Sequence, residues 1–352
     1  MLKIKVTYPG FSGPINIEQF VGNNDNIAID CKFYINDEKI EEADYWFVIE
    51  DMQFEEEALF INKEKIIFLT AEVIHKKKYY DKSYMRSFLD QFNEIYTCHD
   101  IYRENVHYTT PFLPWMINSN HGTSIFSNAK RNINWLKENN SINKPKILSV
   151  FCSNQQMTDD HRLRLKFVKE IKKYFGDELD WYGNGVNAVK EKWSGIAPYK
   201  YHIVLENQSR NNIITEKLYD SFLGLSFPIY YGAPNVNKYF DKNSMEVIDI
   251  YDYKESIKKI EKLILNNDWE KRVQLIIESK NKVLNEYNVF HRIAQIAIKN
   301  EKLSTGKIKQ IVKLSSIKKI SDTTIKMKIN RKATLLIEKI TNSINKINNE
   351  NI

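Results

Sequence analysis

A short polar stretch in the second half of the chain combines a hydroxyl, a carboxylate and an ammonium group at one predicted helix start. Thr215 is a favourable N-cap residue, and Glu216 and Lys217 follow it in the first turn. The first N–H groups of a helix lack backbone partners, so a helix start favours anions, and a lysine there adds a point charge for a phosphate. Glu216 could accept hydrogen bonds from sugar hydroxyls. The same residues would also suit an ordinary capped surface helix with a solvated Glu-Lys pair.

Two apolar runs flank this helix start and complete a predicted β-α-β unit. Tyr201–Leu205 and Phe227–Tyr231 have the length of buried strands, and apolar residues recur at helical spacing between them. Parallel sheets with crossover helices bind ligands at the carboxyl ends of their strands. We therefore expect the polar loop at residues 206–212 and the helix start to share one ligand-binding edge of a sheet.

The sequence of this unit resembles the donor-site signature of the family 10 α-1,3-fucosyltransferases. The signature, E-N-x6-(I/V)-T-E-K-L followed by P-I-Y-Y-G-A-P, is carried here by Glu206, Asn207, Thr215, Glu216, Lys217, Pro228, Gly232 and Pro234. The resemblance extends from about Lys146 to Asn300, is thin before Asn140 and is absent from the C-terminal tail. It implies a GT-B fold, with two Rossmann-like α/β domains facing each other across a cleft, and an inverting, metal-independent transfer of fucose from GDP-fucose to an acceptor glycan.

A transfer of this kind needs positive charge beside the departing diphosphate. The sequence contains no D-x-D motif for a metal, so no metal or other cofactor is expected, and Lys217 and the helix start would supply charge. S-N at residues 153–154 with Arg164-x-x-F is similar to a family pattern whose arginine contacts the pyrophosphate, and a planar guanidinium suits that role. Arg162 competes for this role, and Arg164 could instead be a surface arginine. Asn207 would bind sugar or ribose hydroxyls.

The transfer also needs a base for the acceptor hydroxyl, and Glu72 is the candidate. It follows the predicted strand Lys65–Thr70, where the family has a G-E-N motif, although alanine and valine flank the glutamate here. A glutamate with an ordinary pKa near ~4.3 would need some burial to act efficiently. Glu50 and Asp51, at the end of another predicted strand, are alternative carboxylates. Glu72 could also be an exposed carboxylate beside a run of lysines.

The chain departs from the family at one donor contact. Two positions before Thr215 the family has a tyrosine, whereas this chain has Ile213. Losing the hydroxyl removes a hydrogen bond of about 0.5–1.5 kcal/mol and leaves a more apolar wall. The donor could therefore be another deoxy sugar or another GDP-sugar. Arg210, in the same loop, is an added charge within possible reach of the diphosphate.

Several other classes of protein are disfavoured by missing motifs. The sequence has no G-x-S-x-G, P-loop or G-x-G-x-x-G, which argues against hydrolases of the α/β class, kinases and dinucleotide dehydrogenases. Its histidines show no H-x-x-x-H spacing. The three cysteines form no C-x-x-C pair and predict buried free thiols in a reducing compartment.

Alternating strand and helix patterns predict two α/β domains. Residues 1–117 would form the acceptor-side domain, 118–145 a linker and 146–300 the donor domain. In the first domain the expected strands are Leu2–Thr7, Ile27–Ile35, Tyr45–Ile49, Lys65–Thr70 and Glu94–Cys98, with a helix at Tyr84–Phe92. A short helix is expected at Ile133–Lys137, before the second domain. Besides the strands Tyr201–Leu205 and Phe227–Tyr231, the second domain is expected to have strands at Ile147–Cys152, Leu179–Tyr182 and Met245–Ile250. Its further helices are expected at Asp159–Phe175, Tyr253–Leu265 and Trp269–Tyr287.

The predicted tail, residues 301–352, holds the excess positive charge. It has 12 Lys and Arg against 4 Asp and Glu, and the rest of the chain has 40 against 41. A globular nucleic-acid binder is disfavoured because the basic patch is not on the fold. Apolar residues at helical spacing suggest an amphipathic helix on an anionic membrane, against the alternative of a solvated tail: Leu335, Leu336, Ile340, Ile344 and Ile347. With no signal peptide or transmembrane run apparent, we expect a cytoplasmic protein with possible peripheral membrane contact.

Three functional hypotheses follow from the sequence. The first is an inverting α-1,3-fucosyltransferase with Glu72 as base and a donor site of Arg164, Asn207, Thr215, Glu216 and Lys217. The second keeps this mechanism but uses another nucleotide sugar, because of Ile213. The third is a non-catalytic, membrane-associated glycan-binding protein, because the chain departs from the family at the G-E-N motif and the donor tyrosine.

Overall fold

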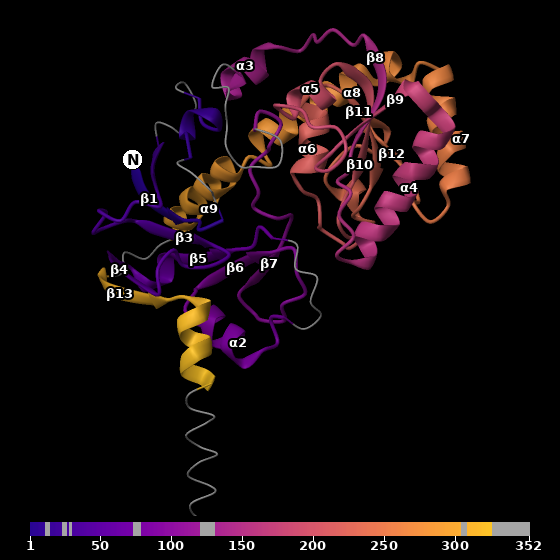
Figure 1. The fold of residues 1–352 in the computed structure, drawn as a ribbon. Helices are drawn as coiled ribbons and strands as arrows, with labels where there is room; N and C mark the ends of the chain where they lie inside the picture. The colour runs from indigo at the N-terminus through magenta and orange to yellow at the C-terminus, as the bar shows by residue number, and fades with distance from the viewer. Residues whose placement is uncertain are drawn as a thin grey trace, which may run out of the picture.

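The computed structural model describes residues 1–10, 15–22, 27, 30–72, 79–119, 131–303 and 308–325. Two α/β domains lie side by side, each built on its own parallel sheet (Figure 1). Short 3-10 turns lie at Ile17–Gln19, Lys63–Lys65, Gly176–Glu178, Val236–Lys238 and Lys242–Ser244. The predicted class of two Rossmann-like domains is confirmed.

The N-terminal sheet has six strands within the described residues, in the order β2-β1-β3-β5-β6-β7. Their bounds are β1 Leu2–Thr7, β2 Cys31–Ile35, β3 Tyr45–Ile49, β5 Ile66–Leu69, β6 Glu94–Thr97 and β7 Val106–Tyr108. The chain passes from β1 to β2 on one side and then to β3 on the other, so β1 and β3 flank the topological switch point. Tyr8 and Glu50, which follow these two strands, lie where open parallel sheets bind ligands.

The C-terminal sheet has five strands in the described part of the chain, in the order β12-β11-β10-β8-β9. Their bounds are β8 Lys146–Phe151, β9 Leu179–Tyr182, β10 Tyr199–Leu205, β11 Phe227–Tyr231 and β12 Glu246–Val247. Here the chain order reverses between β8 and β10. The segments after these two strands contain Ser153, Asn154, Glu206 and Asn207, so the predicted donor residues follow the switch-point strands.

The helices lie on both faces of the C-terminal sheet. These helices are α4 Asp159–Phe175, α5 Trp193–Ile196, α6 Glu216–Leu223, α7 Tyr253–Leu265 and α8 Asp268–Asn285. Two short helices, α2 Ser83–Leu89 and α3 Ile133–Glu138, come earlier in the chain. α4 packs beside α7 on one side of the sheet and α6 beside α8 on the other (Figure 1). Thr158 caps α4, and Asp159 and Asp160 in its first turn complement the helix dipole.

The last long helix leaves the C-terminal domain and packs on the N-terminal one (Figure 1). In α9, Val289–Leu303, the Phe290 ring lies 5.5 Å from that of Phe20 and 5.4 Å from that of Phe33, measured between centroids. Ile293, Ala294 and Ala297 join the same buried cluster as β1 and β3 side chains. One face of the N-terminal sheet is therefore covered by a helix from the far end of the sequence.

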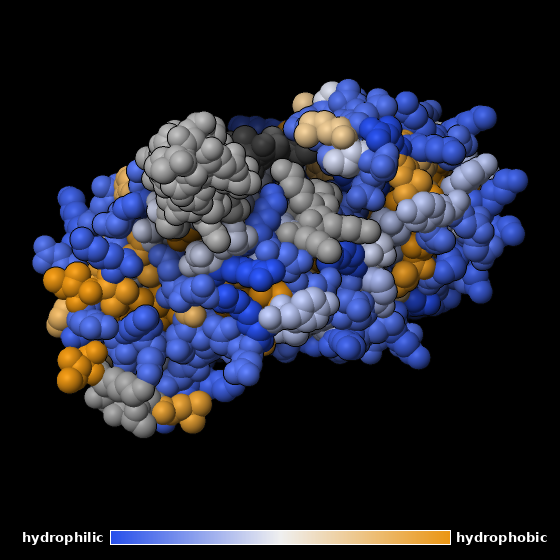
Figure 2. Space-filling model, turned by 90° about the horizontal axis from the view of Figure 1, so that it is seen from below, coloured by the Kyte–Doolittle hydropathy of each residue, from blue (hydrophilic) through white to orange (hydrophobic). Residues whose placement is uncertain are grey.

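Part of the predicted tail is folded onto the N-terminal domain. Strand β13, Gln310–Ser315, pairs antiparallel with β4, Glu56–Ile61. Leu314 of this strand is buried in a hydrophobic cluster of the N-terminal domain. This ribbon exposes Phe60 and Ile311, at 42% and 72%, and apolar surface is visible at the left of Figure 2, on the side of the molecule that carries β4 and β13. The amphipathic pattern from Leu335 to Ile347 lies outside the described residues.

Most predicted elements are present, with the following differences. The strand predicted at Met245–Ile250 is reduced to the two residues of β12, and β4, β7 and β13 were not anticipated. The last predicted helix ends at Tyr287, whereas in the structure a separate helix, α9, follows α8. Among the described residues, no helix is both long and apolar enough to cross a membrane.

Candidate active site

The first turn of α6 is built on a buried carboxylate. Glu206 follows β10 and is fully buried, and its Oε1 accepts the backbone N–H of Thr215 at 2.8 Å. The Thr215 hydroxyl lies 3.0 and 2.8 Å from the two oxygens of the same carboxylate, and it also accepts the N–H of Lys217 at 3.4 Å. The structure thus brings the E-N and T-E-K segments together. Glu206 holds the loop, because both the N–H and the hydroxyl of Thr215 are bound to its carboxylate.

The charges around α6 form a compensated cluster. Lys217 Nζ donates to Glu216 Oε1 at 3.1 Å and lies 3.8 Å from Glu206 Oε2. Lys192, which precedes α5, lies 3.9 Å from Glu216 and 3.0 Å from Asp220. Burial would raise the pKa of Glu216, but the ammonium groups of Lys217 and Lys192 outweigh burial and lower that pKa to about 2. Glu216 is therefore ionised at neutral pH and can accept hydrogen bonds from hydroxyl groups.

Arg164 extends from α4 towards the carboxyl end of β10. Its Nη1 donates to the Leu205 carbonyl at 3.4 Å, and the residue is 8% exposed. The buried Nε–H has no hydrogen-bond partner among the described residues. A buried cationic donor without a partner is costly, and an anion would satisfy it. Burial lowers the pKa of Arg164, but an arginine remains charged at neutral pH.

Arg162, the competing arginine, points elsewhere. Its guanidinium donates to the Gln156 carbonyl at 2.8 Å and to Asp159 within its own loop and first turn. Arg162 is therefore a surface residue of α4, and Arg164 is the arginine that the structure places beside the T-E-K turn.

The loop between β10 and α6 places the remaining predicted donor residues. Asn207 is half-buried and its side-chain amide makes no hydrogen bond to the described residues. Ile213, in place of the family tyrosine, is fully buried. Arg210 Nη2 donates to Asp100 Oδ2 of the N-terminal domain at 2.7 Å, so it spans the two domains instead of facing the T-E-K turn.

Glu72 lies in the N-terminal domain, just after β5. Its side chain is exposed, and its carboxylate makes no hydrogen bond within the described residues. Its backbone is held on both sides, because its N–H donates to Glu50 Oε1 at 2.8 Å and its carbonyl oxygen lies 2.8 Å from His99 Nε2. The run of lysines that follows at residues 76–78 lies outside the described residues.

Tyr8 is a buried tyrosine whose pKa is influenced by carboxylates of both domains. It follows β1 and is 5% exposed. Burial raises the pKa of its phenol, and the charges of Glu72, Glu50 and Glu216 raise it further. The pKa of one phenol thus responds to carboxylate charges from both domains. No sequence motif pointed to Tyr8.

Buried polar contacts tie residues 109–116, which follow β7, to the C-terminal domain and to α9. Asp220 Oδ1, on α6, accepts the N–H of Met116 at 2.8 Å. Arg292, on α9, donates to the carbonyls of Thr110 and Pro111 and to the Thr109 hydroxyl, at 2.9, 2.8 and 2.9 Å. Neither Asp220 nor Arg292 belongs to a motif, because both act through contacts distant in sequence.

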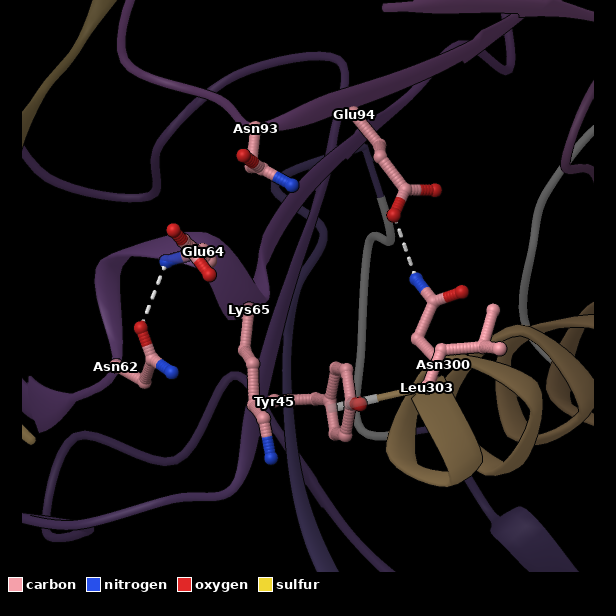
Figure 3. Close-up of a pocket in the computed structure, with 8 residues that line it drawn as sticks. All are labelled: Tyr45, Asn62, Glu64, Lys65, Asn93, Glu94, Asn300 and Leu303. Carbon is pink, nitrogen blue, oxygen red and sulfur yellow. Dashed lines mark hydrogen bonds between the residues drawn. The ribbon is translucent and has the colours of Figure 1, made fainter. Parts of the chain in front are cut away.

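A polar pocket of about 190 Å³ lies at the end of the N-terminal sheet that is opposite to Glu72 (Figure 3). It is formed by the amino-terminal ends of β3, β5 and β6 and by the end of α9. Its polar groups largely satisfy one another, since Asn300 Nδ2 donates to Glu94 at 2.6 Å and Lys65 Nζ donates to Glu301 at 2.5 Å. This pocket is part of the junction between α9 and the sheet, far from Glu72 along the strands.

The described residues contain no group of three or more His, Cys, Asp and Glu side chains arranged to hold a metal ion. The three cysteines, Cys31, Cys98 and Cys152, are buried free thiols, as predicted.

Comparison with known proteins matches the C-terminal domain to a family. Residues 141–274 match the family described as glycosyltransferase family 10 (fucosyltransferase) C-term. A segment of 66 residues is 34% identical to the α-(1,3)-fucosyltransferase FucT of Helicobacter pylori, covering 19% of this chain and 13% of that protein. A segment of 91 residues is 31% identical to GDP-fucose protein O-fucosyltransferase 3 of Danio rerio, covering 26% of this chain and 20% of that protein. The matched segments thus span a fifth or less of these relatives.

The overall architecture is shared with a solved structure. A crystal structure of an α1,3-fucosyltransferase with GDP superimposes with a TM-score of 0.50 at 17% sequence identity, covering 87% of this chain and 91% of that chain. This likeness extends over both domains and supports the two-domain fold.

Proposed function

We propose that the chain, whose residues 141–274 match glycosyltransferase family 10, transfers fucose from GDP-fucose to a hydroxyl of an acceptor glycan. The observation that carries this proposal is Arg164. A buried guanidinium with an unpartnered Nε–H lies at the carboxyl end of β10, near the positive end of α6 and in the segment that matches the family. This arrangement suits a diphosphate.

The donor would be held by the residues predicted from the signature. Arg164 and Lys217 would neutralise the diphosphate beside the amino-terminal end of α6, whose dipole favours an anion. Asn207 and the ionised Glu216 would bind hydroxyls of the ribose or the fucose. With these two cations at the site, the leaving group can be stabilised without a metal ion, so we propose a metal-independent reaction.

The transfer would be a single displacement with inversion at the anomeric carbon. The acceptor hydroxyl oxygen attacks C1 of fucose while the bond from C1 to the diphosphate oxygen breaks. Glu72 takes the proton from the acceptor hydroxyl, and the electron pair of the broken bond goes to GDP, where Arg164 and Lys217 stabilise it. The N-terminal domain would bind the acceptor, and an α-1,3 linkage follows from the resemblance.

The experiment that tests the donor site is a calorimetric titration with GDP and GDP-fucose in the presence of EDTA. We expect Arg164→Ala to weaken binding of both ligands by roughly 10- to 100-fold, because it removes a buried charge-assisted contact of about 1.5–3 kcal/mol. Arg162→Ala is the matched control on the same helix and should leave binding unchanged. Absence of GDP binding by the unaltered protein would contradict the proposal.

A different nucleotide sugar is the second candidate, favoured by one residue. Ile213 is fully buried where the family has a tyrosine, so the wall of the pocket differs in polarity. The same titration with a panel of nucleotide sugars separates the candidates. Binding of GDP but not of GDP-fucose would favour another donor.

A further inference from the structure

Glu50 has an unusual backbone conformation at the carboxyl end of β3. Its φ is +69°, in the left-handed region that non-glycine residues with a long side chain rarely adopt. Its N–H still donates to the Leu69 carbonyl of β5 at 3.0 Å, so the strand pairing continues to this residue. Residues held in such conformations cluster at functional sites, where the surrounding structure maintains them.

The side chain of Glu50 holds the turn that carries Glu72. Its Oε1 accepts the N–H of Ala71 at 2.5 Å and the N–H of Glu72 at 2.8 Å. On the other side of the same turn, His99 contacts the Glu72 carbonyl at 2.8 Å. Both peptide groups of Glu72 are therefore bound by neighbouring segments, one following β3 and one following β6. The Glu72 carboxylate itself makes no hydrogen bond within the described residues.

We propose that Glu50 is a positioning residue, whose carboxylate fixes the turn at residues 71–72 and so directs the Glu72 side chain towards the acceptor hydroxyl. The inference rests on the proposed function, because it assumes that Glu72 is the base. Glu50 does not itself touch substrate in this role. In this chain the base is flanked by alanine and valine, and the turn is held by a side chain from the adjacent strand.

The charge state of Glu50 offers a direct readout of this contact. Burial raises the pKa of Glu50 to about 7, although the two N–H groups oppose that rise, and the charges of Glu72 and Asp51 add to it. Other titratable groups that interact with Glu50 come from the neighbouring segments and are Tyr8, Tyr79, Tyr80 and Cys98. These four are neutral near pH 7, since burial raises the pKa of each.

The activity test compares alanine and glutamine at position 50. Glu50→Ala removes the acceptor for both N–H groups, so we expect kcat to fall by roughly 10- to 100-fold with KM for GDP-fucose unchanged, because a misplaced catalytic group loses about two orders of magnitude. Glu50→Gln keeps a carbonyl acceptor and should restore most of kcat. Asp51→Asn is the matched control, because the Asp51 carboxylate accepts the N–H groups of Met52 and Ile317 and not those of the turn at residues 71–72. If Glu50→Gln were as inactive as Glu72→Gln, Glu50 would be the base and the positioning role would be wrong.

A second measurement does not depend on sugar transfer. In protein labelled with 15N-alanine, the amide proton of Ala71 should shift with a midpoint near pH 7, and the shift should vanish in Glu50→Gln. The Ala71 signal is identified by its loss in Ala71→Gly. An Ala71 amide that does not respond to Glu50 would overturn the inference. Failure of the unaltered protein to transfer fucose, with a responding amide, would overturn the proposed function while supporting the contact.

Discussion

At the scale of single residues, the two carboxylates of the N-terminal domain have different surroundings and therefore different expected roles. Glu72 is exposed and its carboxylate is free to accept a proton, whereas the Glu50 carboxylate is bound to two N–H groups. The ionised form of Glu72 is the one that a base requires. This difference is the reason why we propose Glu72 as the base and Glu50 as the group that holds its turn.

We expect Glu72→Gln to lower kcat/KM by roughly 10²- to 10⁴-fold, the contribution usual for a general base. GDP affinity should not change, because the donor residues lie in the other domain. Initial rates with GDP-fucose and calorimetry with GDP check the two statements. Glu64→Gln, at the opposite end of the same sheet, is a control of equal charge change. Near-full activity of Glu72→Gln would remove Glu72 as the base.

The cluster at the start of α6 could be predicted because its residues are close in sequence. Thr215, Glu216 and Lys217 form one helix turn, and their contact with Glu206 follows from a short loop. Tyr8 could not be predicted, since its relation to Glu72 and Glu216 arises only when three distant segments meet. The choice of Arg164 over Arg162 needed the direction in which each side chain leaves α4.

At the scale of elements, α6 carries Glu216 and Lys217 in its first turn and, at Asp220, a contact with Met116 of the N-terminal half. Burial raises the pKa of Asp220 to about 6, although Lys192 opposes the rise. The ordinary value for an aspartate is about 3.9, so the folded state favours the protonated form. That contribution to stability is fully present below about pH 4 and is lost as the pH rises through about 6.

We therefore expect the stability of the wild type, relative to Asp220→Asn, to fall by about 3 kcal/mol between roughly pH 4 and pH 7. Asparagine keeps an oxygen for the Met116 N–H but cannot ionise. Urea unfolding of both proteins at the two pH values gives the difference. A difference that does not depend on pH would show that Asp220 is not forced towards its neutral form.

Elements with strong local patterns were predictable, and those defined by distant partners were not. The bounds of α4 and α7 agree with prediction because apolar spacing and caps are local features. β13 becomes a strand by pairing with β4, a partner far away in the sequence. β12 is short because only two of its residues pair with β11, at the edge of the sheet.

At the scale of the whole molecule, Arg210 and Asp100 join the two domains at the surface. Their side chains are 43% and 68% exposed, and such pairs contribute about 1 kcal/mol or less. If Arg210 acts only between domains, Arg210→Ala and Asp100→Ala should both leave the Kd for GDP within about twofold of the unaltered protein, the range that a loss of about 0.4 kcal/mol allows. Calorimetry on both variants checks this. A tenfold loss confined to Arg210→Ala would assign Arg210 to the diphosphate instead.

The return of α9 and β13 to the N-terminal domain has a consequence for biosynthesis. Phe290 covers one face of the first sheet, and Leu314 enters the core on the other. A ribosome makes the first sheet early, but it supplies these covering residues only after the whole second domain has been made. The first domain must therefore wait, with apolar surface exposed, while the second one folds. Chaperones that bind nascent apolar segments should accordingly act on the N-terminal half of this chain until its final stretch emerges.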